Sequence, residues 1–326
     1  MIKSILRTFG NPADVTELED LHPRNLEEGE VRIRMLASPI NPADINLIQG
    51  TYGIRPKLPF TPGIEGCGVV IESRDTSFHV EDHVIFMTRS SAWAEEVICP
   101  ASSLLKVPTE TPVEQVAMLK VNPLTAWAML THYLQLPKES WVIQNAANSG
   151  VGVCVIQIAK ILGLRTINLV RREELIPELT ALGGDIVMLD NKESITHIKD
   201  TLEIKAPLLA LNAVGGDSAL RLMDALTPKG IHVTYGAMSK RGLKVPNKFL
   251  IFKGVQLHGF WCSEWMKEIP NPDLQKIIHQ LAQWMVSAGL HQPIDSRYKL
   301  ADISKAITRA QEGKRNGKIL LKMDKI

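Results

Sequence analysis

The sequence predicts an α/β protein with two domains, one rich in β-strands and the other built on a doubly wound parallel sheet. The chain has 326 residues, which is more than one hydrophobic core usually serves. Short apolar or alternating runs fill its first third, whereas strands and helices alternate from Trp141 onward. Such alternation implies a parallel sheet that helices cover on both faces.

The first region is expected to be mostly β. Its strand candidates occupy residues 31–37, 68–73, 82–87 and 93–99. A short helix-like piece between the first two candidates ends at Gly50, and a longer helix runs through residues 124–130.

The second region supplies the parallel sheet. Its strand candidates are residues 141–146, 165–170, 185–189, 207–213, 230–236 and 255–260. Six strands separated by helices suit the dinucleotide-binding arrangement. An amphipathic helix (273–286) and a last helix–strand pair (303–313, 318–323) are expected to pack back on the β-rich domain. The predicted domains are therefore 1–117 with 266–326, and 118–265.

Composition excludes several classes of function. The hydrophobic fraction of 45% and charged fraction of 22% are those of an ordinary globular protein. A net charge of +2 gives no reason to expect nucleic acid as a partner, and no apolar run approaches the roughly 20 residues of a membrane span. MIKSILRTFG lacks the features of a leader peptide, so we expect a cytoplasmic protein, while a processed organellar enzyme stays open.

The most informative stretch is WVIQNAANSGVGVCVIQIAKILG. An apolar strand ends at Asn145, small residues form a tight turn, and a helix begins near Gly150. Amides at the positive end of such a helix can bind a pyrophosphate. The three glycine positions of G-x-G-x-x-G hold Ala147, Ser149 and Gly152, so the bare pattern matches weakly. The strand before and the helix after favour dinucleotide binding over an ordinary turn.

Two arginines indicate which dinucleotide is bound. NAD enzymes carry an acidic residue about 20 positions after the fingerprint, where it bonds the ribose 2′-hydroxyl. Here the strand RTINLV ends in Arg171 and Arg172, and guanidinium groups can grip a 2′-phosphate bidentately. The sequence therefore predicts NADPH rather than NADH. The alternative is that both arginines are solvated charges at a helix start.

Ligands for a catalytic metal are missing from the β-rich region. Zinc alcohol dehydrogenases need Cys and His ligands at fixed places. After the strand VRIRMLA this chain has Ser38 and Asn41 but no cysteine, and where such enzymes have Gly-His-Glu it has Ile64 and Glu65 after a glycine. No two of its four cysteines form a CxxC pair. The sequence predicts no catalytic metal.

Several longer segments together resemble a known family. They are INPADINLIQGTYG, NSGVG, LRTINLVRR, LALNAVGG, VTYGAMSK and LIFKGVQLHGFW. Through them, nearly the whole chain resembles the zinc-independent medium-chain dehydrogenase/reductase superfamily, and most of all its mitochondrial-type trans-2-enoyl-CoA/ACP reductases. The resemblance implies a GroES-like catalytic domain, a Rossmann domain and a homodimer. It also implies NADPH-dependent reduction of enoyl-CoA or enoyl-acyl-carrier-protein.

The resemblance carries residue roles onto this sequence. The family's proton donor corresponds to Tyr52 in QGTYG. The positions that correspond to its NADPH site are Asn122, Asn148, Ser149, Gly150, Val151, Arg171, Arg172, Tyr235, Gly236, Ala237, Met238, Phe260, Trp261, Cys262, Ser263 and Lys318. Glu173 departs from the family, which often has a second basic residue there, so the phosphate is left to Arg171 and Arg172.

The chemistry explains why a tyrosine suits the donor role. Hydride addition to C3 of an enoyl thioester leaves an enolate that needs a proton at C2, and a phenol is protonated near neutral pH. Basic residues that could hold CoA phosphates or an acidic carrier protein are Arg55, Lys57, Arg89, Lys240, Arg241 and Lys253. Phe260, Trp261 and Trp93 are candidates for the acyl path, with core packing as the alternative for Trp93.

Two other functions stay open. Related quinone reductases carry a similar GTY segment, so an NADPH-dependent quinone or enone oxidoreductase is the second hypothesis. The third is an NADPH-binding protein whose reductive site is unused, and Tyr52 counts against it.

Overall fold

The chain folds into two compact units in the computed structural model, which describes residues 1–201 and 206–323. Unit 1 comprises Met1–Val121 and Asn271–Ile326, and unit 2 comprises Asn122–Pro270. The domain limits expected from the sequence, after residues 117 and 265, lie a few residues before these. Residues 202–205 and 324–326 of the expected domains lie outside the described part of the chain.

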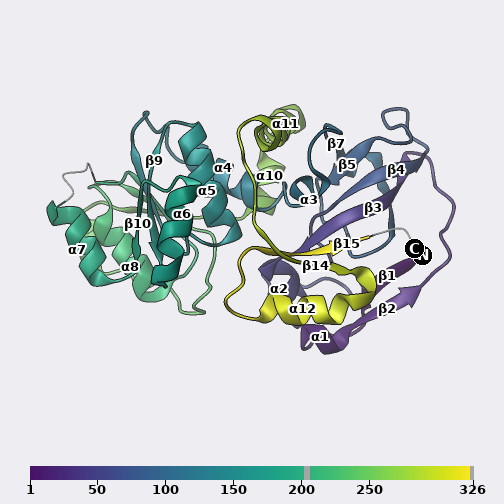
Figure 1. The fold of residues 1–326 in the computed structure, drawn as a ribbon, viewed down its shortest axis with the longest axis horizontal. Coiled ribbons are helices and arrows are strands. Elements are labelled where there is room, and N and C mark those ends of the chain that lie inside the picture. Colours follow the sequence, from purple (N-terminus) through teal and green to yellow (C-terminus); the bar gives the residue numbers. More distant parts are fainter. Residues whose placement is uncertain (202–205, 324–326) are drawn as a thin grey trace. The chain divides into compact units, whose positions relative to one another are not determined.

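Unit 2 contains a six-stranded sheet in the order β10-β9-β8-β11-β12-β13 (Figure 1). Its strands are β8 (Trp141–Gln144), β9 (Arg165–Val170), β10 (Ile186–Leu189), β11 (Leu209–Asn212), β12 (Ile231–Thr234) and β13 (Gln256–Gly259). Every neighbouring pair is parallel. The chain begins at the centre, winds out to β10 and returns to β11 on the other side, which confirms the predicted doubly wound α/β class.

Helices cover both faces of this sheet. They are α4 (Asn122–Thr131), α5 (Gly150–Ile161), α6 (Ile176–Leu182), α7 (Lys192–Thr201), α8 (Gly216–Ala225), α9 (Asn247–Ile251) and α10 (Cys262–Glu268). One buried cluster joins Ile143 and Ile167 of the sheet to α7 and α8, and another joins Val170 to α5 and α6. The inner strands β8, β9 and β11 are mostly buried and read as the apolar runs of a parallel sheet, whereas all four residues of the edge strand β13 are exposed.

Unit 1 contains a seven-stranded sheet in the order β14-β15-β3-β4-β5-β7, with β6 paired to β3 off this path, and a separate β1-β2 pair. The strands are β1 (Ile2–Leu6), β2 (Thr16–Asp20), β3 (Glu30–Ile40), β4 (Cys67–Ser73), β5 (His83–Phe86), β6 (Glu96–Pro100), β7 (Leu104–Lys106), β14 (Ile294–Lys299) and β15 (Lys318–Lys322). The helices are α1 (Pro12–Val15), α2 (Pro42–Gln49), α3 (Val113–Val116), α11 (Asn271–Ser287) and α12 (Ile303–Gln311). Figure 1 shows yellow β15 beside purple β3, an antiparallel pair that joins the two chain segments of this unit.

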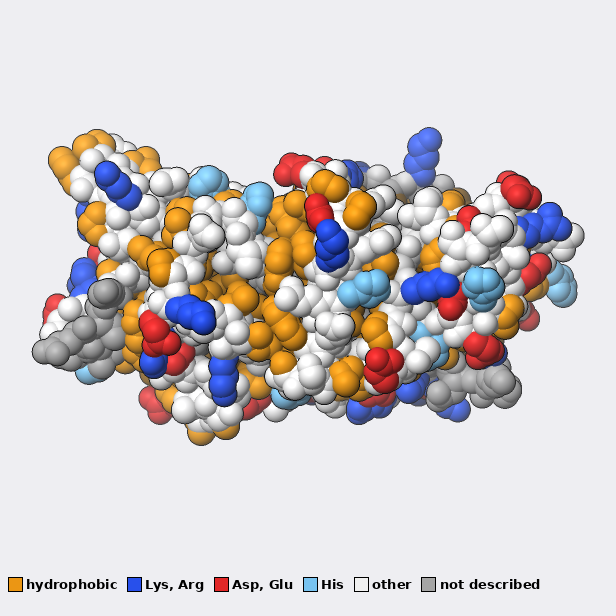
Figure 2. Space-filling model, turned by 90° about the horizontal axis from the view of Figure 1, so that it is seen from above, with side chains coloured by type: hydrophobic (Ala, Val, Ile, Leu, Met, Phe, Trp, Pro, Cys, Tyr) orange, Lys and Arg blue, Asp and Glu red, His pale blue; other side chains and the backbone are white. Residues whose placement is uncertain are grey.

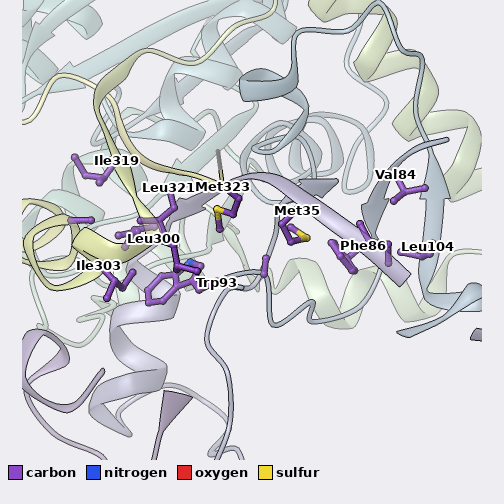
Figure 3. Packing of buried hydrophobic residues seen from close by; sticks show 14 of the residues in the cluster. Met35, Val84, Phe86, Trp93, Leu104, Leu300, Ile303, Ile319, Leu321 and Met323 are labelled. Carbon is purple, nitrogen blue, oxygen red and sulfur yellow. The ribbon is translucent and has the colours of Figure 1, made fainter. Parts of the chain in front are cut away.

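One continuous cluster of buried side chains forms the interior of unit 1. Figure 3 shows Ile303 of α12 near Leu321 of β15 at one end of this cluster, and Phe86 of β5 near Leu104 of β7 at the other. Trp93 is completely buried in this cluster, and its indole N–H donates to Pro39 O at 3.4 Å. The suggestion that Trp93 lines the acyl path is therefore wrong. A side chain at Gly63 would meet Ala92 N at 2.6 Å and Trp93 Cδ1 at 2.8 Å, so only glycine lets this loop pass so close.

Surface charges of both signs are interspersed on the face that Figure 2 draws, without a continuous field of one sign. This pattern agrees with the small net charge of +2. Within residues 1–201 and 206–323, no helix has the length and apolar character needed to cross a membrane.

Candidate active site

Four of the predicted cofactor segments lie at one edge of the unit 2 sheet. Residues 148–151 follow β8, residues 171–172 follow β9, residues 235–238 follow β12 and residues 260–263 follow β13. Because all these strands are parallel, their carboxyl ends meet at the same edge. Ligands of doubly wound sheets bind outside the carboxyl ends of the strands, next to the point where the strand order reverses.

The turn between β8 and α5 is shaped to hold an anion. Ser149 is the N-cap of α5, and its hydroxyl accepts the Gly152 N–H at 3.1 Å. Ser149 N in turn donates to Ala146 O at 2.8 Å, which closes the turn. The backbone amides of Gly150 and Val151 precede the capped amide, at the positive end of a twelve-residue helix. This arrangement fits the pyrophosphate of a dinucleotide.

Gly152 explains why a fingerprint with one matching glycine still forms the turn. A Cβ at this position would lie 2.5 Å from Ala147 O and 2.7 Å from Ala146 O, closer than real Cβ atoms approach. The position therefore has to be glycine. Ala147 and Ser149 occupy the other two positions with small side chains, and Ala147 is fully buried.

The arginine pair follows β9 directly. Arg171 is exposed, and Arg172 is half-buried and bonds Glu174 Oε1 at 3.0 Å. Glu173 begins a short 3-10 helix and is exposed. Arg171 is therefore exposed at the sheet edge. Arg172 could bind a phosphate by exchanging its partly exposed ion pair with Glu174 for one with the phosphate.

Tyr235 stands close to the cap of α5. Its hydroxyl is buried, and burial raises its pKa, while the nearby Ser149 hydroxyl opposes that rise. Its backbone N–H donates to Asn212 O at 3.0 Å, and Met238 N donates to Ala213 O at 2.9 Å. The loop after β12 is thus fixed against the loop after β11, while Met238 itself is 56% exposed.

A chain of buried polar side chains beneath these loops was missed by the sequence reasoning. Asn145 Nδ2 donates to Asn212 Oδ1 and Ser218 Oγ, both at 2.8 Å, and Asn145 Oδ1 accepts Ala213 N at 2.7 Å. Ser218 Oγ donates to Asp190 Oδ2 at 2.5 Å. The chain joins β8, β11, α8 and the end of β10. An asparagine at the end of each of two apolar strands was the available signal.

Aromatic side chains surround a cavity of about 490 Å³ in unit 2. Its lining includes Phe260, Trp261, Trp265, Tyr133 and His132. Tyr133 donates its hydroxyl to Gly259 O at 2.9 Å and so closes one wall. Trp261 is 36% exposed, whereas Phe260 and Trp265 are buried. Two of the predicted cofactor residues, Phe260 and Trp261, therefore line a cavity whose wall also contains Thr234 and the carboxyl groups of Glu264 and Glu268.

Tyr52 lies in unit 1, in the loop that directly follows α2. Gly50 ends this helix in the left-handed conformation with a φ of 70°, which favours glycine. The N–H groups of Thr51 and Tyr52 both donate to Asn46 O, at 2.9 and 3.2 Å. The backbone that carries the phenol is therefore bonded to the last turn of α2.

The same loop is packed from the other side by Phe9. Arg55 stacks over the Phe9 ring at 4.5 Å from its centre. A side chain at Gly50 would meet Phe9 Cγ at 3.1 Å and the Arg55 guanidinium at 3.2 Å. The backbone conformation therefore favours glycine, and a larger residue would also have to displace the side chains of Phe9 and Arg55.

Buried hydrogen bonds connect the residues that stand where zinc alcohol dehydrogenases would have metal ligands. Ser38 Oγ donates to Glu65 O at 2.6 Å, and Asn41 Nδ2 donates to Glu65 Oε1 at 2.9 Å. Lys318 Nζ donates to Asn41 Oδ1. Ile64 offers no ligand atom in its side chain. Among the described residues no cluster of three or more His, Cys, Asp or Glu could hold a metal ion, so this donor set does not fit zinc.

The structure thus groups most predicted cofactor residues but not all of them. Asn122 is buried at the start of α4, which packs on α5 within unit 2. Lys318 begins β15 in unit 1 and is 8% exposed within the network around Asn41. The roles of all these residues stay predictions.

Comparison with known proteins identifies the family. Residues 27–109 match the alcohol dehydrogenase GroES-like domain family, and residues 150–283 match the zinc-binding dehydrogenase family. The mitochondrial enoyl-[acyl-carrier-protein] reductase of Xenopus tropicalis is 39% identical over 94% of this chain and 91% of its own length. The corresponding protein of Rattus norvegicus is 40% identical over 91% of this chain and 82% of its own length.

Solved structures agree with this assignment. The mitochondrial 2-enoyl thioester reductase Etr1p/Etr2p of Candida tropicalis superimposes with a TM-score of 0.89 at 29% identity, covering 98% of this chain and 99% of that one. The Etr1p/NADP/crotonyl-CoA complex gives 0.87 at 28% identity with the same coverage. A protein described as an NADPH:quinone reductase of Bacillus thuringiensis gives 0.90 at 27%, covering 98% of both chains. The predicted resemblance is confirmed: the chain belongs to the enoyl-[acyl-carrier-protein] reductase family of the medium-chain dehydrogenase/reductase superfamily.

Proposed function

We propose that this chain is an NADPH-dependent reductase that saturates the C2–C3 double bond of 2-enoyl thioesters, either enoyl-CoA or enoyl-acyl-carrier-protein, in fatty-acid synthesis. The observation that carries the proposal is the identity of about 40% to named enoyl-[acyl-carrier-protein] reductases over more than nine-tenths of the chain. A related chain with NADP and crotonyl-CoA supports the same cofactor and substrate class.

In this proposal unit 2 binds the cofactor. The capped N-terminus of α5 would hold the pyrophosphate, and Arg171 with Arg172 would hold the 2′-phosphate. When bound, NADPH supplies the hydride that adds to C3 of the substrate. The half-buried backbone of residues 235–236 and the aromatic side chains of Phe260 and Trp261 would limit the access of water to that position.

Tyr52 would supply the proton that C2 then needs. A phenol ordinarily titrates near pH ~10, so it is a competent donor at neutral pH. The two hydrogen bonds to Asn46 O fix the backbone that carries this phenol. A positioned general acid contributes roughly 10²–10⁴-fold to the rate.

The Tyr52→Phe variant tests this role. It should lower kcat by about 10²-fold or more, because the positioned acid is lost. The dissociation constant for NADPH should stay unchanged in a fluorescence titration. Tyr298→Phe is a matched control, because that half-buried phenol packs against the core of unit 1 and belongs to none of the predicted site segments. Undiminished turnover of Tyr52→Phe would remove Tyr52 from the mechanism.

The thioester handle would be held by some of the basic residues already named. Lys253 is the weakest of these candidates, because its ammonium donates to Met223 O at 2.9 Å and Asp224 O at 2.6 Å. Lys240 and Arg241, in contrast, are exposed. We therefore favour Lys240 and Arg241 over Lys253 as contacts for CoA phosphates or for an acidic carrier protein.

A homodimer is part of the proposal. β13 is the edge strand of the unit 2 sheet, and all four of its residues are exposed. Beside it, Ile251 is 69% exposed and Phe252 is 85% exposed. An open edge flanked by apolar side chains suits pairing with a second copy. Phe252→Glu should shift the mass measured by light scattering toward the monomer, and a wild-type monomer would refute the dimer.

The location of the protein is a separate matter. The relatives are named as mitochondrial proteins. A cytoplasmic location, as predicted from the sequence, and a processed organellar form are two alternatives that cell fractionation with an antibody would distinguish.

The first experiment follows NADPH oxidation by the purified chain with trans-2-hexenoyl-CoA and, in parallel, with a small quinone. Fast turnover of the thioester and little of the quinone supports the proposal. The reverse result would favour the quinone reductase alternative, which the fold similarity to a protein of that description keeps open. NADPH binding without turnover of either would favour a binding protein.

A further inference from the structure

Asp44 occupies an unusual position at the start of α2. It is completely buried and lies in the first turn of the helix. Its Oδ2 accepts the N–H of Asn41, the N-cap residue, at 2.9 Å. Its Oδ1 accepts the N–H of Ile64 at 2.9 Å, from the loop that leads into β4. One carboxyl group therefore fixes both the beginning of α2 and a second, distant segment.

The other end of the same helix carries the proposed proton donor. α2 has only eight residues, from Pro42 to Gln49. Its last turn supplies Asn46 O, which accepts the N–H groups of Thr51 and Tyr52. A displacement of the first turn of so short a helix is passed on to its last turn, because the intervening hydrogen bonds make the helix a rigid unit.

Charged groups surround Asp44 on neighbouring elements. Glu65, before β4, adds a second buried carboxyl group, and Lys318 of β15 brings a positive charge. Lys120 acts on Glu65 and on the Ile64 loop, because its ammonium donates to Ile64 O and Thr88 O, both at 2.6 Å. Asp44 and Lys120 therefore bind the same residue of this loop, Asp44 through Ile64 N and Lys120 through Ile64 O.

The pKa of Asp44 is raised toward neutral pH. Burial raises its pKa to about 7, helped by the charge of Glu65, while the N–H donors of Asn41 and Ile64 and the charge of Lys318 oppose the rise. The carboxylate form can accept both N–H bonds fully, whereas protonation of either oxygen weakens one of them. Only the ionised form is therefore matched to both segments.

We propose that Asp44 is a positioning residue for Tyr52: its carboxylate holds α2 against the Ile64 loop and so sets the place of the phenol. The inference rests on the proposed function, in which Tyr52 donates the proton. Asp44 touches neither substrate nor cofactor in this role. It acts through the helix.

The test compares Asp44→Asn with Asp295→Asn. Both changes replace a carboxylate of unit 1 by an amide of the same shape. Asp295 accepts Arg309 Nε at 2.9 Å and Arg309 Nη2 at 2.7 Å in the joint between β14 and α12, so it controls for a general loss of stability. Turnover of crotonyl-CoA is measured from pH 5.5 to 9, with NADPH affinity, thermal unfolding and the effect of D₂O on kcat.

Asp44→Asn should lower kcat by roughly tenfold to a hundredfold, as expected for a misplaced reacting group, and leave NADPH affinity unchanged. The effect of D₂O on kcat should rise, because proton donation becomes slower. In the wild type, kcat should fall as the pH drops below about 7, and Asp44→Asn should lose this dependence. Asp295→Asn should keep the wild-type pH profile even if it unfolds at a lower temperature.

The following outcomes would overturn the role of Asp44, alone or together with the proposed function. If Asp44→Asn fails to fold, Asp44→Glu takes its place, and wild-type kcat with an unchanged effect of D₂O in that variant would overturn the role of Asp44. Wild-type kcat and pH profile in a folded Asp44→Asn would overturn it alone, leaving the proposed function intact. A wild-type chain that does not oxidise NADPH with crotonyl-CoA would overturn the proposed function and this role together.

Discussion

Gly152→Ala changes the cofactor turn by a single methyl group. The added Cβ would lie 2.5 Å from Ala147 O and 2.7 Å from Ala146 O, whereas real Cβ atoms essentially never come within 3.0 Å of such neighbours. Both neighbours are backbone atoms, so no side chain can rotate away to relieve the contact. Residues 146 and 147 must therefore move by about half an ångström relative to α5, or the first turn of α5 must open.

The size of the effect follows from this displacement. Overpacking of a tight site costs about 1–3 kcal/mol of folding stability. A binding site has to be held within about 0.5 Å of its productive geometry, so the same shift lies at the limit of what the pyrophosphate site tolerates. Since about 1.4 kcal/mol corresponds to a tenfold change in affinity, we expect NADPH to bind at least tenfold more weakly.

NADPH fluorescence titration and urea unfolding measure the two effects separately. Gly242→Ala is the matched control, because a Cβ there meets nothing within 4 Å. Wild-type stability and wild-type NADPH affinity in Gly152→Ala would refute the argument that this glycine is demanded by the turn. Lost stability with unchanged affinity would refute the link between the turn and the cofactor.

The remaining predictions concern the cofactor phosphate, acid stability and metal. Replacing both Arg171 and Arg172 by alanine should raise the dissociation constant of NADPH at least tenfold, since charge-assisted bonds contribute about 1.5–3 kcal/mol, and should leave that of NADH unchanged. Lys244→Ala, at an exposed position, is the control. An equal loss of affinity for both cofactors would contradict the assignment. Burial lowers the pKa of His232 to about 4 from an ordinary value near 6.5, so folding stability should fall as the pH drops from about 6.5 to 4, by up to roughly 3 kcal/mol. His232→Leu should flatten this dependence in urea unfolding at pH 4.5 and 7, and an unaltered slope would contradict it. Dialysis against EDTA should leave turnover unchanged, and a loss that zinc restores would contradict the absence of a catalytic metal.

The parallel sheet could be predicted because its strands carry a purely local signal. β11, for example, is buried in all four residues, and its sequence LALN is apolar up to its last position. Strands of mixed exposure were harder to find. β14 has the sequence IDSRYK and no fully buried residue, and β2 reads TELED, so neither shows the apolar run or alternation that would reveal it. Their pairing with β15 and β1 decides their structure.

Trp93 shows a different limit. Its residue type was compatible with both a ligand-lining and a core role, and hydrophobicity cannot separate the two. The expected strand at 93–99 also begins later, because β6 starts at Glu96. Trp93 and Glu95 instead bond to the β1 backbone, as Ser4 N donates to Trp93 O and Glu95 N donates to Ile2 O, each at 2.8 Å. Partners about ninety residues away in sequence determine this stretch.

The site itself has a part with a local sequence signal and a part without one. Strand, turn and helix are contiguous around Ser149, so the cofactor turn could be predicted from one short continuous stretch of sequence. Asn41 and Asp44 also have a local signal, since Asn-Pro-x-Asp is a helix start with its capping residue. That signal predicts an exposed cap, however, because first-turn acids usually face water. Burial of Asp44 arises only when the Ile64 loop and Lys318 close over it, and Lys318 lies 277 positions from Asn41. A carboxyl group surrounded by such distant segments can have a shifted pKa that no local sequence pattern predicts. The pH dependence of kcat therefore tests the part of the site that forms only when the chain folds.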